Sequence, residues 1–180
     1  MPTGKQQIIY WDTCVFIAWM KDEERVAGDM DGVKRVADLV EKDEVILITS
    51  MLTRAELLES KFKKGDVKKY DQVTRRNNVV PQNLDLPIAI LTSKIRDYYL
   101  KSDFELLTPD AIHLATAIHY NADEFQTFDG SNPRSPRNTT RYKRCGLLLL
   151  DGDVAGHRLK ICKPTAEQYE LKFKPGKQTL

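Results

Sequence analysis

Short runs rich in β-branched residues alternate along the chain with stretches of helical periodicity, and this alternation most constrains the fold. "QIIYWDT", "EVILITS" and "NVV" are typical of strands, and "DGVKRVADLVEK" has apolar residues on one helical face. "LPIAILTSKIRDYYLKS" and "TPDAIHLATAIHYN" are helical and carry early prolines, whereas "EFQTFDG" and "RLKICKP" predict two later strands. Because strands separated by helices usually pair in parallel, we expect an α/β/α sandwich with a mostly parallel central sheet of four to five strands.

The length and composition favour one ordinary globular domain. The chain has 180 residues, 41% apolar and 30% charged, which is enough to bury a core. No apolar run approaches the roughly 20 residues of a membrane span, and the first residues lack the pattern of a signal peptide. The three cysteines form no Cys-x-x-Cys pair. We therefore expect a reduced, cytoplasmic protein without membrane association.

The net charge of +2 hides an uneven distribution. Residues 1–130 carry 17 Lys and Arg against 22 Asp and Glu, whereas residues 131–180 carry 11 against 4. Residues 130–146, "GSNPRSPRNTTRYKRCG", have the composition of a basic loop. A polyanionic partner would explain this asymmetry, but basic segments also simply keep proteins in solution, so charge alone does not decide.

Four carboxylates occupy positions that an α/β fold would bring to one sheet edge. Asp12 ends the first predicted strand and Asp129 follows the "EFQTF" strand. Glu56 lies on the helix after the second strand, and Asp110 lies in the first turn of the helix before the fourth. Because the carboxyl ends of parallel strands share one edge, we expect these four side chains to converge.

Each carboxylate also has an ordinary structural explanation. Asp12 can cap the following helix, and Asp110 can complement a helix dipole, which is worth about 0.3–1 kcal/mol. Glu56 can be a surface residue, and Asp129 before a glycine can belong to a turn. The four together are harder to explain in this way.

Clustered carboxylates raise one another's pKa values, so a cluster needs a compensating cation. No Lys or Arg in these motifs is an obvious partner, which favours a hard divalent cation such as Mg²⁺. Zinc is not indicated, because the cysteines and histidines lack ligand spacing. His113 and His119 are six residues apart, and we interpret them as packing or surface residues.

The segments "IIYWDTCVFI", "TSMLTRAELLES", "TPDAIHLATAIHYNADEF" and "QTFDG" resemble those of PIN-domain ribonucleases, in particular the VapC-type toxins. The resemblance covers residues 8–130. It implies a nuclease that uses Mg²⁺ or Mn²⁺ to cut RNA and leaves a 5′-phosphate. By position, it makes Asp12, Glu56, Asp110 and Asp129 catalytic, with Asp12, Asp110 and Asp129 as metal ligands. It also implies that Thr13 and Thr127 support the cluster.

The chain departs from the VapC pattern in its second half. We expect a single PIN-like domain over residues 1–180, with a core at about 7–130 and a late strand at about 158–164. Residues 130–157 then form an insertion or basic loop, and residues 165–180 form an extension. Because the VapC pattern does not cover these segments, the resemblance supports the nuclease fold more directly than it supports a toxin role.

Basic residues on the rim would hold RNA by its phosphates. The candidates are Arg54, Lys61, Lys63, Lys64, Arg134, Arg137, Arg141, Lys143 and Arg144. The resemblance also implies a possible protein antitoxin and a possible homodimer. "VFIAWM", residues 15–20, is a candidate dimer surface, although core packing also explains it. Two alternatives stay open: a non-catalytic PIN-like module that binds RNA or protein, and a structure-specific DNA nuclease.

Overall fold

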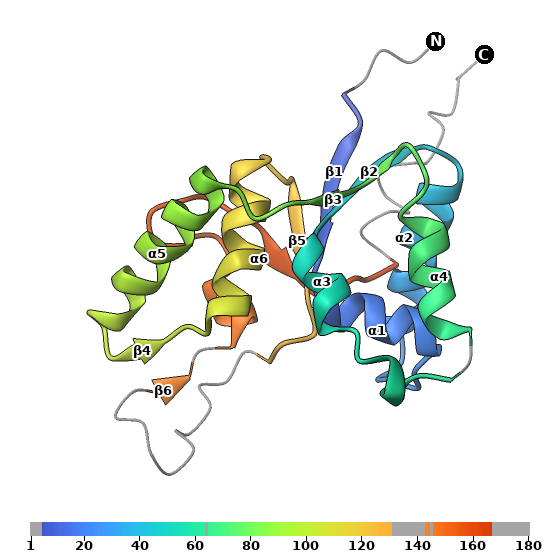
Figure 1. Cartoon of the computed structure of the whole chain (residues 1–180), viewed down its shortest axis with the longest axis horizontal. Coiled ribbons are helices and arrows are strands. Elements are labelled where there is room, and N and C mark those ends of the chain that lie inside the picture. The colour runs from blue at the N-terminus through green and yellow to red at the C-terminus, as the bar shows by residue number, and fades with distance from the viewer. Residues whose placement is uncertain (1–4, 64, 131–142, 145, 167–180) are drawn as a thin grey trace, which may run out of the picture.

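A five-stranded sheet with every strand parallel forms the centre of the molecule (Figure 1). The computed structural model describes residues 5–63, 65–130, 143–144 and 146–166. The strand order is β3-β2-β1-β5-β7, so the first strand lies in the middle. The bounds are β1 (Gln7–Trp11), β2 (Val45–Ser50), β3 (Val79–Gln82), β5 (Glu124–Gln126) and β7 (Ile161–Cys162). The predicted α/β class and parallel sheet are confirmed.

Helices cover both faces of this sheet, as Figure 1 shows. On one side lie α1 (Thr13–Lys21), α2 (Asp29–Glu41) and α4 (Asp66–Val73). On the other lie α5 (Leu86–Leu100) and α6 (Thr108–His119). The remaining elements are α3 (Met51–Glu56), η1 (Glu59–Lys61), η2 (Leu147–Leu150), and the two-stranded sheet of β4 (Phe104–Glu105) and β6 (Lys143–Arg144).

Strand β1 shows how the sequence divides the core between the two faces. Ile9 and Trp11 pack with α1, α2 and α4, whereas Tyr10 packs with α5 and α6. This alternation follows from the two-residue period of a strand. The apolar residues of "VFIAWM" on α1 mostly enter the same core, since Phe16 and Met20 are fully buried. Core packing therefore explains that stretch.

Residues 146–157, which we expected to belong to an insertion, contribute to the core on the α5–α6 side, as does Leu159 from the expected late strand. Leu147, Leu150, Val154 and Leu159 are all buried there. The Tyr99 hydroxyl also donates to the backbone carbonyl of Asp153, at 3.4 Å. The earlier part of the segment, residues 131–142, lies outside the described residues.

Helix α3 ends earlier than its sequence suggests. The stretch "MLTRAELLES", residues 51–60, is an α-helix only as far as Glu56, because Leu57 takes an extended conformation (φ −76°, ψ 94°) and is buried. The hydroxyl of Ser50 caps the helix by accepting from the backbone N–H of Leu52 at 3.1 Å. The early stop leaves Glu56 at the carboxyl end of the helix.

Candidate active site

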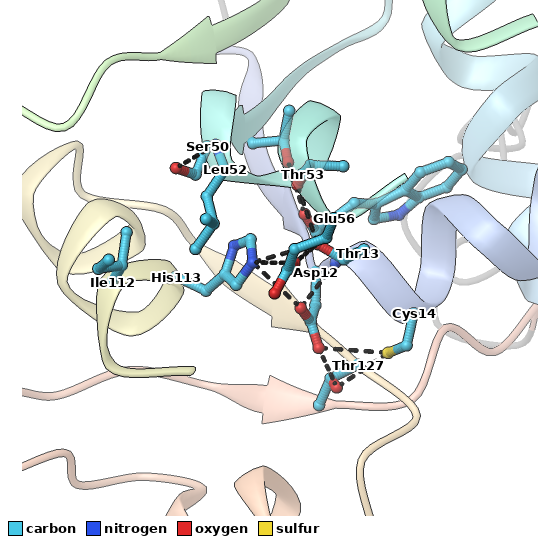
Figure 2. Close-up of polar contacts among 12 residues, drawn as sticks. Asp12, Thr13, Cys14, Ser50, Leu52, Thr53, Glu56, Ile112, His113 and Thr127 are labelled. Atoms are coloured by element: carbon cyan, nitrogen blue, oxygen red, sulfur yellow. Dashed lines mark hydrogen bonds and ion pairs between the residues drawn. The ribbon is translucent and has the colours of Figure 1, made fainter. Parts of the chain in front are cut away.

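Asp12 stands at the carboxyl end of β1, beside the end of the neighbouring strand β5. Its backbone N–H donates to Gln126 O at 3.1 Å, which ties the two strand ends together. Its side chain accepts from the backbone N–H of Thr13 at 2.6 Å and from the hydroxyl of Thr127 at 2.8 Å. Cys14 Sγ lies 3.2 Å from the same carboxylate (Figure 2). Asp12 therefore caps α1 and is also a fixed, buried carboxylate at the sheet edge.

His113 links Glu56 to this carboxylate. Figure 2 shows its ring pointing from α6 toward Glu56, Thr13 and Asp12. Its Nε2 lies 3.2 Å from Glu56 Oε2 and 3.7 Å from Asp12 Oδ1, and its Nδ1 is 2.7 Å from the Tyr10 hydroxyl. The hydroxyl of Thr13 donates to Glu56 Oε2 at 2.5 Å. One buried ring thus connects three elements of the site.

His113 brings a basic side chain into the cluster that the sequence did not suggest. Burial favours the neutral ring, but the hydrogen bond to Glu56 and the charges of Asp12, Glu56 and Asp110 outweigh it and raise the pKa. For Glu56, burial is opposed by the hydrogen bonds from His113 and Thr13, and its pKa is lowered. His113 is buried against Tyr10, as a packing residue would be, but it also contacts Glu56, which the sequence interpretation did not include, whereas His119 is exposed.

Asp110 carries the clearest electrostatic signature of the cluster. Burial, together with the negative charges of Asp12, Asp129 and Glu56, raises its pKa from 3.8 to about 7. His113 opposes this shift but does not cancel it. The four predicted carboxylates are therefore close enough to interact, and near neutral pH Asp110 is only partly ionised. Leu107 occupies the cap position of α6, and Thr108 is its first helical residue.

Asp129 is held from two directions. Its backbone N–H donates to the Thr127 hydroxyl at 3.0 Å. Its Oδ2 accepts from the backbone N–H of Leu147 at 2.9 Å. Leu147 lies beyond the basic loop and is fully buried, so the core segment after the loop helps to orient this carboxylate. Thr127 contacts both Asp12 and Asp129, and Thr13 contacts Glu56, as expected of supporting residues.

The cluster offers the kind of ligand atom that a hard divalent cation prefers, but these atoms are not arranged as a complete coordination site. Carboxylate oxygens from Asp12, Asp110 and Asp129 are the ligands that Mg²⁺ and Mn²⁺ prefer. Among the described residues, no three His, Cys, Asp or Glu side chains are grouped so that they hold a metal as they stand. Burial and the neighbouring carboxylates both raise the pKa of Asp110, and a bound cation would oppose this shift by favouring the ionised carboxylate.

The basic candidates have different surroundings. Arg54 is engaged in ion pairs with Glu59 at 2.9 Å and Asp71 at 3.5 Å. Lys61 and Lys63 line a hollow beyond the carboxyl end of α1. Lys143 and Arg144 form β6. Lys64, Arg134, Arg137 and Arg141 lie outside the described residues.

Arg25, which is not among the sequence candidates, lies close to the cluster. Its guanidinium carbon is 4.0 Å from the centre of the Phe128 ring. Phe128 stands between Thr127 and Asp129, and its backbone N–H donates to Cys14 Sγ at 3.2 Å. Arg25 and His113 are thus two basic residues near the cluster that sequence reasoning missed. The spacing of His113, three residues after Asp110 on one helix, was a usable signal, since such residues share a face.

Within the described residues, no helix combines the length and the apolar character needed to cross a membrane.

Comparisons with known proteins bear on the fold and the family of the chain. None of the curated proteins matches the sequence. Two similar solved structures are VapBC2 from Rickettsia felis bound to a DNA fragment from its promoter, and VapC20 from Mycobacterium tuberculosis, a Sarcin-Ricin loop cleaving toxin. The first is 16% identical with a TM-score of 0.54, covering 70% of this chain and 89% of that one. The second is 17% identical with a TM-score of 0.51, covering 68% and 90%. These likenesses concern the fold. The family model of the PIN domain matches residues 9–134, so the chain belongs to the PIN-domain family.

Proposed function

We propose that this protein is a divalent-metal-dependent endoribonuclease whose active site is the carboxylate cluster. One observation carries the proposal. Burial at the sheet edge, together with the charges of three other carboxylates, raises the pKa of Asp110 to about 7. A fold gains no stability from such a concentration of like charge, so it is expected where a cation must bind.

Asp12, Asp110 and Asp129 are the residues that would hold the cation. A bound Mg²⁺ or Mn²⁺ neutralises charge on the phosphoryl oxygens and lowers the pKa of its bound water. Asp12 is preorganised for this role by the donors Thr13 N–H and Thr127 Oγ1, which fix both carboxylate oxygens. The backbone N–H of Leu147 orients Asp129 in the same way.

Glu56 has a different role, because it is bound to His113 and Thr13. The contacts of Glu56 with His113 and Thr13 offset part of the negative charge of Glu56 within the cluster. Asp110 and Asp129 are then the carboxylates whose charge a bound cation would neutralise. Arg25, held against Phe128 and paired with Glu23 at 2.7 Å, is a cation beside the cluster that would contact a phosphate of the bound strand.

We further propose that the protein is the toxin of a toxin–antitoxin pair. The named neighbours are a VapBC complex and a VapC toxin, and we extend that role to this chain as a proposal. A small DNA-binding protein encoded next to this gene, which binds the chain and blocks cleavage, is the expected antitoxin.

The function is tested with Asp110→Asn and the control Asp38→Asn, an exposed aspartate on α2. Both proteins and the wild type are incubated with single-stranded RNA, with DNA of the same sequence, and with a structured RNA, with Mg²⁺ or with chelator. We expect metal-dependent RNA cleavage by the wild type and the control, and none by Asp110→Asn. Undiminished cleavage by Asp110→Asn would refute the assigned site.

The two alternatives give different results in the same experiment. Cleavage of DNA alone would favour a structure-specific DNA nuclease. RNA binding without cleavage by any variant would favour a non-catalytic module. All four carboxylates of the cluster are present, which disfavours a non-catalytic module.

A further inference from the structure

A second site lies beyond the carboxyl end of α1, where lysines surround a hollow of about 480 Å³. Its lining residues are Met20, Lys21, Lys61, Lys63, Asp66 and Lys69. Four of the six are therefore cationic and one is anionic. Such a concentration of exposed ammonium groups needs an explanation, since like charges this close repel one another.

The nearby carboxylates do not neutralise these lysines. Among the described residues, none of the four lysines forms an ion pair with a carboxylate. Asp22 pairs with Lys34 at 3.1 Å, and Glu59 pairs with Arg54 at 2.9 Å. Asp66 Oδ2 accepts from the backbone N–H of Lys63 at 3.0 Å. The acidic groups around the hollow are thus already engaged.

The structure itself accounts for only part of the cluster. Lys69 Nζ donates to Met20 O at 2.8 Å, as expected for a cation at a helix carboxyl end. Lys21 Nζ lies 4.7 Å from the centre of the Phe62 ring. No comparable contact holds the side chains of Lys61 and Lys63 among the described residues. Their position beside Lys21 and Lys69 therefore points to a ligand.

The hollow lies within reach of a strand bound at the carboxylate cluster. Helix α1 begins beside Asp12 and ends at Lys21, and its 1.5 Å rise per residue gives a separation of roughly 12 Å. Lys61 follows Glu56 by five residues along the chain. Both segments that leave the cluster thus carry lysines toward the same hollow.

We propose that this hollow binds phosphate groups of the RNA strand roughly three to four stacked nucleotides from the cleaved bond, at about 3.4 Å per nucleotide. This inference rests on the proposed function. Lysines suit such a role, because each is a point charge that contacts phosphate without reading sequence. An acidic peptide is less well matched, since Met20 is the only apolar residue in the lining. The site would hold RNA against an acidic centre that otherwise repels it.

The test compares two triple variants with equal loss of charge. One is Lys21→Gln, Lys61→Gln, Lys63→Gln, which leaves Lys69 in its capping contact. The matched control is Lys5→Gln, Lys42→Gln, Lys94→Gln, which removes exposed lysines from the opposite sheet edge and from α5. Both are made with Asp110→Asn to prevent cleavage. Binding of a labelled 12-nucleotide RNA is measured by fluorescence anisotropy at several salt concentrations, and circular dichroism verifies folding.

The proposal predicts that the hollow variant loses at least about tenfold in affinity. The slope of log K against log salt should become less steep by about 2, because each of the three lost phosphate contacts contributes roughly 0.7 to it. The control variant should change much less. Equal losses in both variants, or no loss in the hollow variant, would overturn the proposal. Unchanged RNA affinity with lost binding of a polyglutamate peptide would overturn it in favour of an acidic protein partner.

Cleavage assays with Asp110 restored separate this inference from the proposed function. With long RNA, the hollow variant should have a raised KM and an unchanged kcat, whereas a dinucleotide too short to reach the hollow should be cut as by the wild type. A wild type that never cleaves RNA would refute the function. A wild type that cleaves, with a hollow variant of identical KM, would refute only the subsite.

Discussion

Replacing Asp110 with Asn should make the metal-free protein more stable, although it removes a residue of the active site. In the folded protein, burial and the charges of Asp12, Asp129 and Glu56 raise the pKa of Asp110 from 3.8 to about 7. Because the folded-state pKa lies above the ordinary value, the neutral carboxyl favours folding. That stabilisation is fully present below pH 3.8 and is lost as the pH rises through about 7. Asparagine keeps the shape without the charge.

The magnitude follows from the two pKa values. Their difference corresponds to roughly 4 kcal/mol at 1.36 kcal/mol per pKa unit, as an upper limit. Asp110 is not fully buried, and salt screens part of the repulsion, so about 1–3 kcal/mol is the realistic range. For a protein of this size, each kcal/mol shifts Tm by about 2–4 °C, so that gain raises Tm by roughly 2–12 °C.

The assay is thermal unfolding in chelator, measured from pH 4 to pH 8.5 for the wild type, Asp110→Asn and the control Asp38→Asn. The difference in Tm between Asp110→Asn and the wild type should be small at pH 4, grow through pH 7 and stay constant above it. Asp38→Asn should follow the wild type throughout. Saturating Mg²⁺ should stabilise the wild type more than Asp110→Asn.

A Tm for Asp110→Asn equal to or below that of the wild type at pH 8 would refute the reasoning. That result would mean that Asp110 is stabilised by contacts that outweigh the repulsion from its neighbours. A constant difference at every pH would also contradict it, because a packing effect of asparagine does not titrate.

Three further changes test other parts of the structure. His113→Ala leaves Glu56 without its buried partner, so urea denaturation at pH 7 should show a loss of about 3 kcal/mol; a loss near zero would contradict the network. Gly32→Ala places a methyl group against the backbone carbonyl of Pro164, and calorimetry should show a destabilisation of about 1–3 kcal/mol, whereas an unchanged Tm would mean that residues 163–166 move aside easily. Thr127→Val removes the hydroxyl that donates to Asp12, so RNA cleavage should slow about tenfold while the fold stays intact, and full activity would show that this contact does not orient the carboxylate.

The sequence was sufficient for the sheet and for the acidic positions. Strands and helices differ in the spacing of their apolar residues, so both can be predicted from the sequence. In a parallel sheet, the carboxyl ends of β1 and β5 lie at the same edge. Asp12 and Asp129 were therefore predictable from local pattern and topology. Glu56 and Asp110 followed because each lies on a helix that adjoins the same edge.

The rest depended on packing between segments far apart in the chain. The role of His113 arises from Tyr10 and Glu56, which are 103 and 57 residues away, and no local pattern encodes such a meeting. Leu147 reaches Asp129 only because the segment after the basic loop enters the core. The ion pair of Arg54 with Asp71 likewise brings together two helices, α3 and α4, whereas its pair with Glu59 is local in the chain.

The most direct test of the central claim is RNA cleavage by metal-stripped wild-type protein as Mg²⁺ is restored stepwise, with Asp129→Asn measured in parallel. The account predicts no cleavage in chelator, recovery of cleavage by the wild type as Mg²⁺ saturates, and no recovery by Asp129→Asn at any Mg²⁺ concentration. Cleavage of RNA at the same rate in chelator and in Mg²⁺ would contradict the claim that the carboxylate cluster is a metal-dependent nuclease centre.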